Sequence, residues 1–242
     1  MENPLHHFEL HPLVDLHLFG LDLSINNGVV TMWFAVAVIF ILFRVAASQG
    51  RSVPGVLQNL VEIGVEFVQG MAEDNIGPNG RRYVPFLIAL FFFVLFLNLW
   101  GLIPGQFTVT SQLYVTATLA VAVYVISLVV GFARHGVGFL RILLPAGTPA
   151  WLIPLMVPVE ILSQLARPLS LAVRLFANMT AGHTILAVLF GMALALPVWA
   201  GWLPFGITVA IYALELFIAF IQAYIFVMLS CVYFGDAENL AH

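Results

Sequence analysis

Apolar residues fill long stretches of the chain, and polar residues gather between them. Three stretches, 29–47, 83–103 and 113–133, are each long enough to cross a hydrocarbon core of about 30 Å once as a helix. Two later blocks, 151–196 and 202–234, are longer than one upright crossing requires. The pattern predicts an all-α polytopic membrane protein with about five membrane helices in a single membrane domain.

The excess length of the last two blocks predicts an unusual geometry. As one helix, residues 157–189 would be about 50 Å long at ~1.5 Å per residue, which exceeds the thickness of the core. Either the helix breaks, with Pro168 and Gly182 as candidate bend points, or it lies strongly tilted in the membrane. We expect both helices to be long and strongly tilted.

Two other segments are more polar. Residues 53–74 place apolar side chains near helical spacing with acidic residues among them, which predicts an amphipathic helix. Residues 1–28 carry acidic residues and four histidines but no arginine, which predicts an external tail rather than a cleavable signal. The four histidines could bind a metal, or they could belong to a solvated or interfacial tail. They are His6, His7, His11 and His17.

Composition supports the membrane class. Hydrophobic residues make up 62% of the chain, charged residues 8%, and the mean hydropathy is +1.05. Soluble domains carry about 25% charged residues, so this chain has too little polar surface to cover itself in water. The absence of a basic patch argues against nucleic-acid binding. The single cysteine, Cys231, excludes an internal disulfide framework and a multi-cysteine metal site.

The arginines predict the orientation. All eight basic residues are arginine, and six of them fall at span ends that share one side of the membrane. The positive-inside rule places this side in the cytoplasm, so the N-terminus is expected outside and the C-terminus inside. The six are Arg44, Arg51, Arg81, Arg82, Arg134 and Arg141.

Three ionisable residues of the first long block lie on one stripe. Glu160, Arg167 and Arg174 are seven residues apart, so each lies only about 20° around the helix from the one before. Polar side chains lie on or beside this stripe, at Ser163, Ser170 and Asn178. A charge near the bilayer centre costs about 2.5–3.5 kcal/mol, so such residues are expected to face protein or water and to serve a function.

A second polar set points elsewhere. His183 lies nine residues past Arg174, half a turn around the helix. On the last block, Glu215 and Gln222 share a face, with Tyr212 beside Glu215. Composition and spacing therefore predict an intramembrane ion path with an arginine near mid-membrane.

Structural interpretations of these residues stay open from the sequence. Arg167 could simply extend to the inner interface, and Glu160 could form a structural ion pair with Arg167. His183 and Glu215 could form a buried pair that only locks two helices together. A purely structural Arg174 is the hardest to defend, because it lies some fourteen residues inside its segment.

Several motifs resemble F-type ATP synthase subunit a. Leu165–Met179 (LARPLSLAVRLFANM) is similar to the family signature R/K-P-(ISV)-S-L-x-x-R-L-F-x-N-M. Asn98–Pro104 (NLWGLIP) and Gln222–Phe226 (QAYIF) resemble two further family stretches, and Asn3–Phe8 (NPLHHF) fits bacterial members. The resemblance covers essentially the whole chain, and the arginine motif is its most specific part.

The resemblance implies a role for each candidate. Arg174 would face the rotating ring of c subunits, with Asn178 and Gln222 as its polar neighbours. Glu160 would serve the inner half-channel. His183 and Glu215 would serve the outer half-channel, in the order that resembles mitochondrial-type members. Ala177 replaces a glycine that is common in the family, a small-for-small change.

The same resemblance implies the setting of the chain. It would be a non-catalytic proton-translocating subunit without a cofactor or metal, with the c-ring, the peripheral-stalk b subunits, other ATP synthase subunits and the bilayer as partners. Its location would be a bacterial inner membrane or, as an alternative, the mitochondrial inner membrane.

Two other classes fit less well. A secondary transporter often shows inverted repeats, and none is visible here. An intramembrane protease would need a motif such as G-x-S-x-G or H-E-x-x-H, and both are absent. Copurification with a large complex would separate a subunit from a lone transporter.

Overall fold

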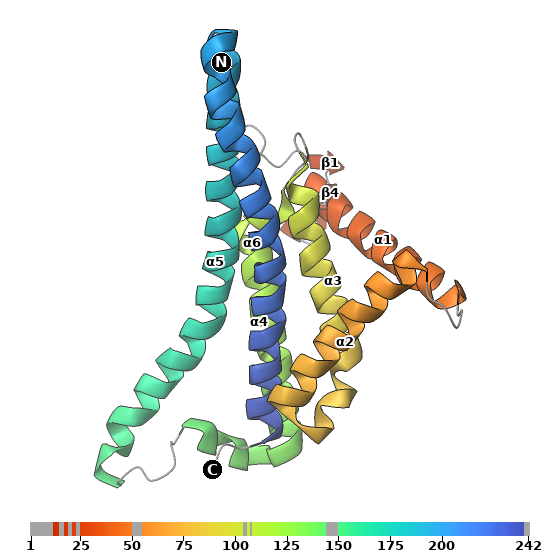
Figure 1. Ribbon diagram of the computed structural model, residues 1–242. Coiled ribbons are helices and arrows are strands. Elements are labelled where there is room, and N and C mark those ends of the chain that lie inside the picture. Colours follow the sequence, from red (N-terminus) through yellow and green to blue (C-terminus); the bar gives the residue numbers. More distant parts are fainter. Residues whose placement is uncertain are drawn as a thin grey trace. The chain divides into compact units, whose positions relative to one another are not determined.

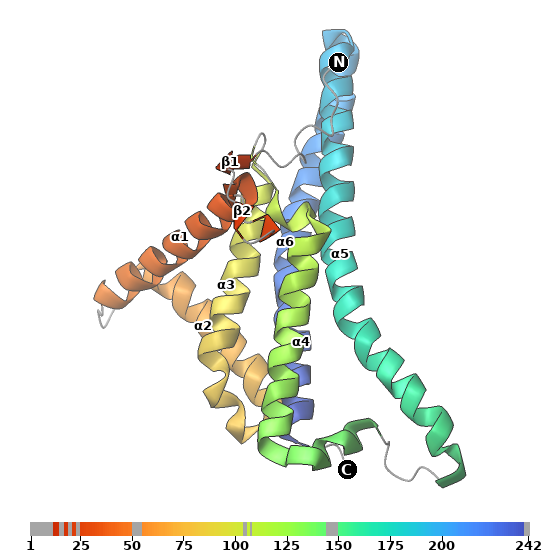
Figure 2. The ribbon, with the colours of Figure 1, turned by 180° about the vertical axis from the view of Figure 1, so that it is seen from behind.

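The computed structural model describes residues 12–14, 17–18, 21–22, 25–49, 55–103, 106, 108–143 and 150–239 (Figures 1 and 2). Its elements, in chain order, are β1 (Pro12–Val14), β2 (His17–Leu18), β3 (Leu21–Asp22), β4 (Ile25–Asn26), α1 (Asn27–Gln49), α2 (Val56–Ile76), η2 (Pro78–Arg82), α3 (Val84–Gly101), η3 (Val109–Ser111), α4 (Leu113–His135), η4 (Gly136–Leu143), η5 (Ala150–Leu152), α5 (Ile153–Ala195) and α6 (Val198–Glu238).

Among the described residues, five helices are long and apolar enough to cross a membrane, as the sequence predicts. A helix suits this role because all its backbone hydrogen bonds are made within the segment. The five candidate spans are Asn27–Ser48, Val84–Gly101, Leu113–Leu140, Ile153–Ala195 and Ala200–Glu238. The predicted all-α polytopic fold is therefore confirmed.

The two long helices are continuous. α5 has 43 residues and contains both Pro158 and Pro168, and α6 has 41 residues and contains Pro204. The break that was one of the two possibilities for the first long block therefore does not occur in α5. Both helices are longer than an upright crossing requires, so their steep tilt in the bilayer remains the expectation.

The helix α2 is amphipathic, as expected. Val61 and Val68 are buried on one side, whereas Glu62, Glu66 and Glu73 are exposed. The helix ends where Gly77 adopts φ of 82°, a left-handed conformation that glycine reaches without a steric penalty. The Gly77 N–H donates to the Glu73 carbonyl at 3.1 Å and thereby satisfies one of the last carbonyls of the helix.

Part of the N-terminal tail forms short strands. β1 pairs with β4 and β2 pairs with β3, both in antiparallel fashion. Figure 1 labels β1 and β4 together before α1, and Figure 2 shows β2 from behind. His17 lies in β2, whereas His6, His7 and His11 lie outside the described residues, as does Arg51.

The chain divides into two compact units. Unit 1 consists of residues 1–48, 92–115 and 175–223, and unit 2 of residues 49–91, 116–174 and 224–242. The single membrane domain expected from the sequence stays a prediction.

Two small buried clusters lie in the part of unit 1 that the structure describes. In the first, Ala35 of α1, Leu97 of α3 and Val109 of η3 are buried together. In the second, Leu102, Met179 of α5 and Ala219 of α6 are buried together. The second cluster packs the part of α5 just before His183 against the part of α6 just after Glu215.

Aromatic rings pack against one another around the last turns of α6 in unit 2. The ring of Phe234 stacks on Tyr83 with centroids 4.8 Å apart and meets Phe86 edge-on at 5.9 Å. Tyr233, the preceding residue of α6, meets Tyr124 of α4 edge-on at 5.7 Å. Offset and edge-to-face pairs of this kind each add about 0.5–1.5 kcal/mol beyond their area burial. They hold the last turns of α6 against the beginning of α3 and against α4.

Candidate functional site: polar groups on α5 and α6

One face of α5 is exposed and carries Arg174. Leu162, Leu169 and Val173 are exposed on this part of the helix, and Ser163 and Ser170 are exposed among them. The face is therefore apolar with a narrow polar stripe. The stripe contains the residues that helical spacing grouped in the sequence.

Arg174 is exposed within this apolar face, and it has no ion pair or hydrogen bond with any other described residue. Its guanidinium has five N–H donors and stays protonated under all ordinary conditions. A permanently charged group on a membrane helix needs water or an opposite charge. The structure leaves the Arg174 guanidinium accessible on this apolar face.

The other two ionisable residues of the stripe have partners within unit 2. Arg167 pairs with Asp236 of α6, with Nη1 and Oδ2 3.3 Å apart. Glu160 accepts a hydrogen bond of 3.0 Å from the Gln164 amide one turn along α5. Among the ion pairs of the described residues, the partner of Arg167 is thus Asp236 and not Glu160. Arg174 is the ionisable member of the stripe that has no polar partner among the described residues.

A small cavity lies between α4, α5 and α6 in unit 2. Its volume is about 100 Å³, which is enough for a few water molecules. Ten residues line it: Tyr124, Ser127, Leu128, Phe132, Phe139, Leu140, Ile142, Gln164, Tyr233 and Asp236. The Tyr233 hydroxyl is buried there and has no hydrogen-bond partner among the described residues. The partners of Arg167 and Glu160, Asp236 and Gln164, thus both border this cavity.

The second polar set predicted from the sequence, which includes His183 and Glu215, lies in unit 1. His183 of α5 is half-buried, and its Nε2 lies 3.2 Å from the Thr108 hydroxyl. The Glu215 carboxylate of α6 lies directly against Gly182, where a Cβ would overlap its Oε1. Glycine at this position lets the carboxylate approach the backbone of α5 closely. The structure therefore brings His183 and Glu215 to the same region, through contacts with Thr108 and Gly182 rather than through a direct hydrogen bond.

Several oxygen atoms of this region are buried without a hydrogen-bond partner among the described residues. They are both carboxylate oxygens of Glu215, Oε1 of Gln222, Oδ1 of Asn98 and Oγ1 of Thr180. Each unpaired buried group of this kind costs about 1–3 kcal/mol. Buried polar atoms are rarely left in this state unless water or a functional partner reaches them. A group of unpaired acceptors beside an imidazole is suited to binding water and passing protons.

Asn98 ties α3 to this region. Its amide donates a hydrogen bond of 3.3 Å to the Ala219 carbonyl of α6, one turn past Glu215. The side chain is fully buried, although it is polar. The hydrogen bond fixes α6 against α3 where Glu215 and Gln222 lie on either side along the helix.

The remaining predicted residues are placed as follows. Asn178 is half-buried on α5, and Tyr212 of α6 is exposed. Gln222 is buried.

Sequence reasoning missed Thr108 and Asp236. Neither could be found from helical spacing, because Thr108 precedes the short η3 helix and Asp236 lies where the apolar block gives way to a polar tail.

No group of three or more histidine, cysteine, aspartate or glutamate side chains within the described part of the chain could hold a metal ion. The geometry instead offers two separate polar regions. Unit 2 has an arginine-bearing stripe with a nearby cavity, and unit 1 has an imidazole–carboxylate region with unpaired acceptors.

These features define a class of protein: a multi-pass helical membrane protein with ionisable groups inside its two longest spans. The family model for the ATP synthase A chain matches residues 29–235. The chain therefore belongs to the ATP synthase A chain family.

Relatives support this assignment over nearly the whole length. ATP synthase subunit a of Magnetococcus marinus is 49% identical over 243 residues, which cover 98% of this chain and 93% of the relative. ATP synthase subunit a of Rhodospirillum rubrum is 42% identical, with 99% of this chain and all of the relative covered. The corresponding subunit of Pelagibacter ubique is 41% identical, with 99% of each chain covered. The chain is thus a component of the ATP synthase complex, and these relatives are bacterial.

Proposed function

We propose that this chain is the proton-translocating stator of the membrane sector, and that Arg174 faces an acidic residue of a rotating c-ring. The observation that carries the proposal is the exposed charge of Arg174 on an apolar face of α5, where it has no polar partner among the described residues. An approaching carboxylate supplies the missing opposite charge, and the arginine favours its ionised form. Ionisation releases a proton at a defined point of the rotation.

The inner half-channel takes this proton away. Glu160, Ser163 and Ser170 share the stripe of Arg174 and provide polar groups along the exposed face. Gln164, which donates to Glu160, borders the cavity of about 100 Å³ that also contains Asp236. Water in this cavity would extend the polar route from the Glu160 carboxylate toward the end of α6.

The outer half-channel supplies the next proton. His183 and Glu215 form its relay, and Gln222 and Asn178 provide further polar groups. The unpaired oxygens of Glu215 and Gln222 support this role, because water that binds them would join the imidazole to the carboxylate. Histidine suits a relay because its unperturbed pKa near 6.5 lets the side chain gain and lose a proton readily.

Arg174 separates the two routes. The guanidinium does not lose its proton, so it cannot carry protons between the half-channels. Its fixed charge instead holds each ring carboxylate in the ionised form until the ring has moved on. Proton flow therefore requires rotation, and the chain itself needs no catalytic group, cofactor or metal.

The setting follows from the same proposal. The partners are the c-ring, the peripheral-stalk b subunits, the other ATP synthase subunits and the lipid bilayer, and the location is a bacterial inner membrane. The distribution of the arginines supports an external N-terminus and a cytoplasmic C-terminus. The exposed apolar side chains of α1 and α5 support a large contact with lipid or other subunits.

The test uses inverted vesicles that contain the complete complex, with ATP-driven acidification as the readout. Arg174→Ala is expected to abolish acidification, because the ring carboxylate loses its opposite charge. Val173→Ala, which trims the exposed apolar side chain next to Arg174, is the matched control and is expected to retain most of the activity. Pumping by Arg174→Ala at the level of the control would refute the proposal.

A further inference from the structure

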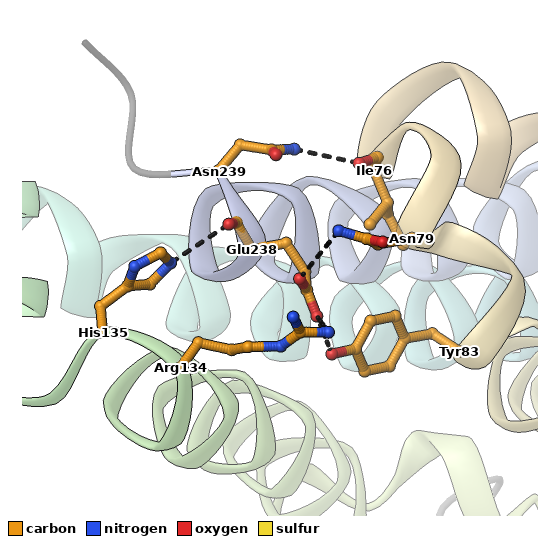
Figure 3. Close-up of polar contacts among 7 residues, drawn as sticks. All are labelled: Ile76, Asn79, Tyr83, Arg134, His135, Glu238 and Asn239. Carbon is orange, nitrogen blue, oxygen red and sulfur yellow. Dashed lines mark hydrogen bonds and ion pairs between the residues drawn. The ribbon is translucent and has the colours of Figure 1, made fainter.

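A second group of polar side chains, outside the proposed proton path, gathers around the end of α6. Glu238, the last residue of α6, has a side chain that is only 1% exposed. Its Oε1 lies 3.1 Å from Nη2 of Arg134 at the end of α4 and also accepts a hydrogen bond from the Tyr83 hydroxyl. Its Oε2 accepts a hydrogen bond of 3.5 Å from the Asn79 amide of η2. Figure 3 shows these side chains converging on the carboxylate from separate segments.

The backbone at the same place is held as well. The Glu238 carbonyl lies 3.1 Å from Nε2 of His135, which follows Arg134 on α4. The Asn239 amide donates to the Ile76 carbonyl at the end of α2, at 3.0 Å (Figure 3). The last carbonyls of a helix have no partner within the helix, and donors placed there stabilise its end. We refer to Asn79, Tyr83, Arg134, His135 and Glu238 as the Glu238 cluster.

Close packing reinforces the polar contacts. Gly235, three residues before Glu238, lies so near the Asn75 carbonyl of α2 that a Cβ would overlap its oxygen. Phe234 stacks on Tyr83, which also belongs to the cluster. The last turn of α6 is therefore fixed both along its axis and around it, because rotation would drive the helix into α2 and would separate Phe234 from Tyr83.

The cluster differs from an ordinary surface ion pair in the same unit. Arg81 and Glu73 lie 3.5 Å apart, but their side chains are 79% and 44% exposed. Exposed pairs of this kind are screened by water and salt and fix little. The Glu238 carboxylate, in contrast, is removed from water and compensated by three side chains of two other segments.

We propose that Glu238 is a positioning residue that sets the height and the rotation of the last turns of α6, and through them the placement of Tyr233 and Asp236, which line the cavity of unit 2. Tyr233 and Asp236 lie five and two residues before Glu238 on the same continuous helix, so a shift at its end displaces both side chains. Each residue of a helix advances by about 1.5 Å and turns by about 100°, so even a small change of register re-aims the side chains. This consequence for transport rests on the function proposed above.

The test begins with Glu238→Ala and Glu238→Gln in the assembled complex. Glu238→Gln keeps the size and some hydrogen bonds of the side chain but removes its charge, so it serves if the alanine variant fails to assemble. The exposed acid of unit 2 gives the matched control, Glu73→Gln. The first readout is the ratio of ATP-driven proton pumping to ATP hydrolysis. We expect this ratio to fall by about 3- to 10-fold in the Glu238 variants, as for a misplaced catalytic group, and to stay unchanged in the control.

The second readout is independent of the proton path. Cys231 is the single cysteine of the chain, is fully buried, and lies seven residues before Glu238 on the same side of α6. A thiol reacts with N-ethylmaleimide as the thiolate, which requires access to water. We expect labelling of Cys231, measured by mass spectrometry of this subunit, to become faster in both Glu238 variants and not in Glu73→Gln.

A charge reversal tests the ion pair itself. Arg134→Glu and Glu238→Arg are each expected to lower the pumping ratio, and the double variant is expected to recover part of it because the opposite charges are restored. A general loss of packing would not be repaired in this way.

The outcomes separate the two proposals. Unchanged labelling, an unchanged pumping ratio in both Glu238 variants, or no recovery in the double variant overturns the positioning role. Faster labelling with recovery of the pumping ratio supports it. If Arg174→Ala still pumps, the proposed function fails, whereas the labelling of Cys231 continues to report whether the cluster holds α6.

Discussion

The Glu215 region of unit 1 and the Glu238 cluster of unit 2 each surround a glutamate of α6. The two regions differ in the partners that they offer to its carboxylate. Both oxygens of Glu215 are buried without a hydrogen-bond partner among the described residues. The oxygens of Glu238 are contacted by Arg134, Tyr83 and Asn79. The same helix thus carries one carboxylate without a hydrogen-bond partner among the described residues, at Glu215, and one carboxylate with an ion pair and hydrogen bonds, at Glu238.

The difference matches the two roles proposed for these carboxylates. A carboxylate that exchanges protons must be reached by water and must not be held by an arginine, because a permanent opposite charge would keep it ionised. A carboxylate that fixes a helix benefits from such a partner, because a buried charge without a partner is destabilising. We therefore propose transport for the unpaired acceptors around Glu215 and anchoring for the paired carboxylate of Glu238.

The largest expected effect is at Glu215. Glu215→Leu removes the carboxylate, and we expect ATP-driven pumping to fall by about 100-fold or more, as for the loss of a general acid–base group. The swapped pair, His183→Glu with Glu215→His, keeps one acid and one imidazole and is expected to retain part of the activity. Normal pumping by Glu215→Leu would show that the Glu215 carboxylate does not take part in the proposed outer half-channel.

A smaller but sharper effect is expected at Gly182. In Gly182→Ala the new Cβ overlaps the Glu215 carboxylate, and overpacking of this kind costs about 1–3 kcal/mol. We expect proton pumping to fall roughly 10-fold, because the carboxylate is displaced. The measurement is acidification of vesicles that contain equal amounts of assembled complex.

Two companion variants control this prediction. Gly191 lies on the same helix, and a Cβ added there would meet no neighbouring atom within 4 Å, so Gly191→Ala is expected to pump normally. Glu215→Asp shortens the side chain, and its combination with Gly182→Ala is expected to recover activity relative to Gly182→Ala alone. Equal activity of the two alanine variants would contradict the close approach of Glu215 to α5.

A moderate effect is expected at Thr108. Thr108→Val removes the hydroxyl that lies 3.2 Å from the His183 ring while keeping its shape. A hydrogen bond contributes about 0.5–1.5 kcal/mol, so we expect pumping to fall about 2- to 10-fold. The control is Thr184→Val, whose hydroxyl donates to the Thr180 carbonyl of its own helix. A greater loss in the control than in Thr108→Val would argue against a role for Thr108 in orienting His183.

The smallest effect concerns the pH dependence of the Glu238 cluster. Burial, and then the hydrogen bond to Glu238, raise the pKa of Tyr83 above its ordinary value near 10. A raised pKa means that the neutral hydroxyl is favoured in the folded protein. Its stabilising contribution is therefore complete below about pH 10 and is lost as the pH rises through the raised pKa.

Tyr83→Phe should reveal this contribution. At about pH 8 the variant is expected to unfold at a slightly lower temperature than the wild type, and the difference should shrink as the pH is raised above about 10. The measurement is the difference in thermal midpoint between the two complexes at each pH, so that alkaline effects common to both cancel. A difference that grows with pH would reverse the sign that the cluster requires.

Helical spacing was sufficient to find the candidate residues of the two long helices. Glu160, Arg167 and Arg174 were grouped by their seven-residue separation, and their roles stay predictions. The same reasoning predicted the membrane helices and the amphipathic helix correctly, because the apolar pattern alone decides which segments enter lipid.

Contacts between distant segments could not be predicted in this way. Asp236 lies 69 residues after Arg167, and Glu238 lies 155 residues after Tyr83. No periodic pattern links such positions, so neither partner could be identified from spacing. Gly182 remains a candidate bend point, and the structure shows in addition that it makes room for the Glu215 carboxylate, a contact that no spacing predicts.

The most direct test of the account measures passive proton flow through membranes from which the catalytic sector has been removed. Arg174 is charged and has no polar partner among the described residues. Its fixed charge is proposed to prevent protons from passing directly between the two half-channels. With Arg174→Ala we predict a proton leak that no longer depends on ring rotation, together with the loss of ATP-driven pumping. A membrane that remains as tight as the wild type, with pumping retained, would contradict the account.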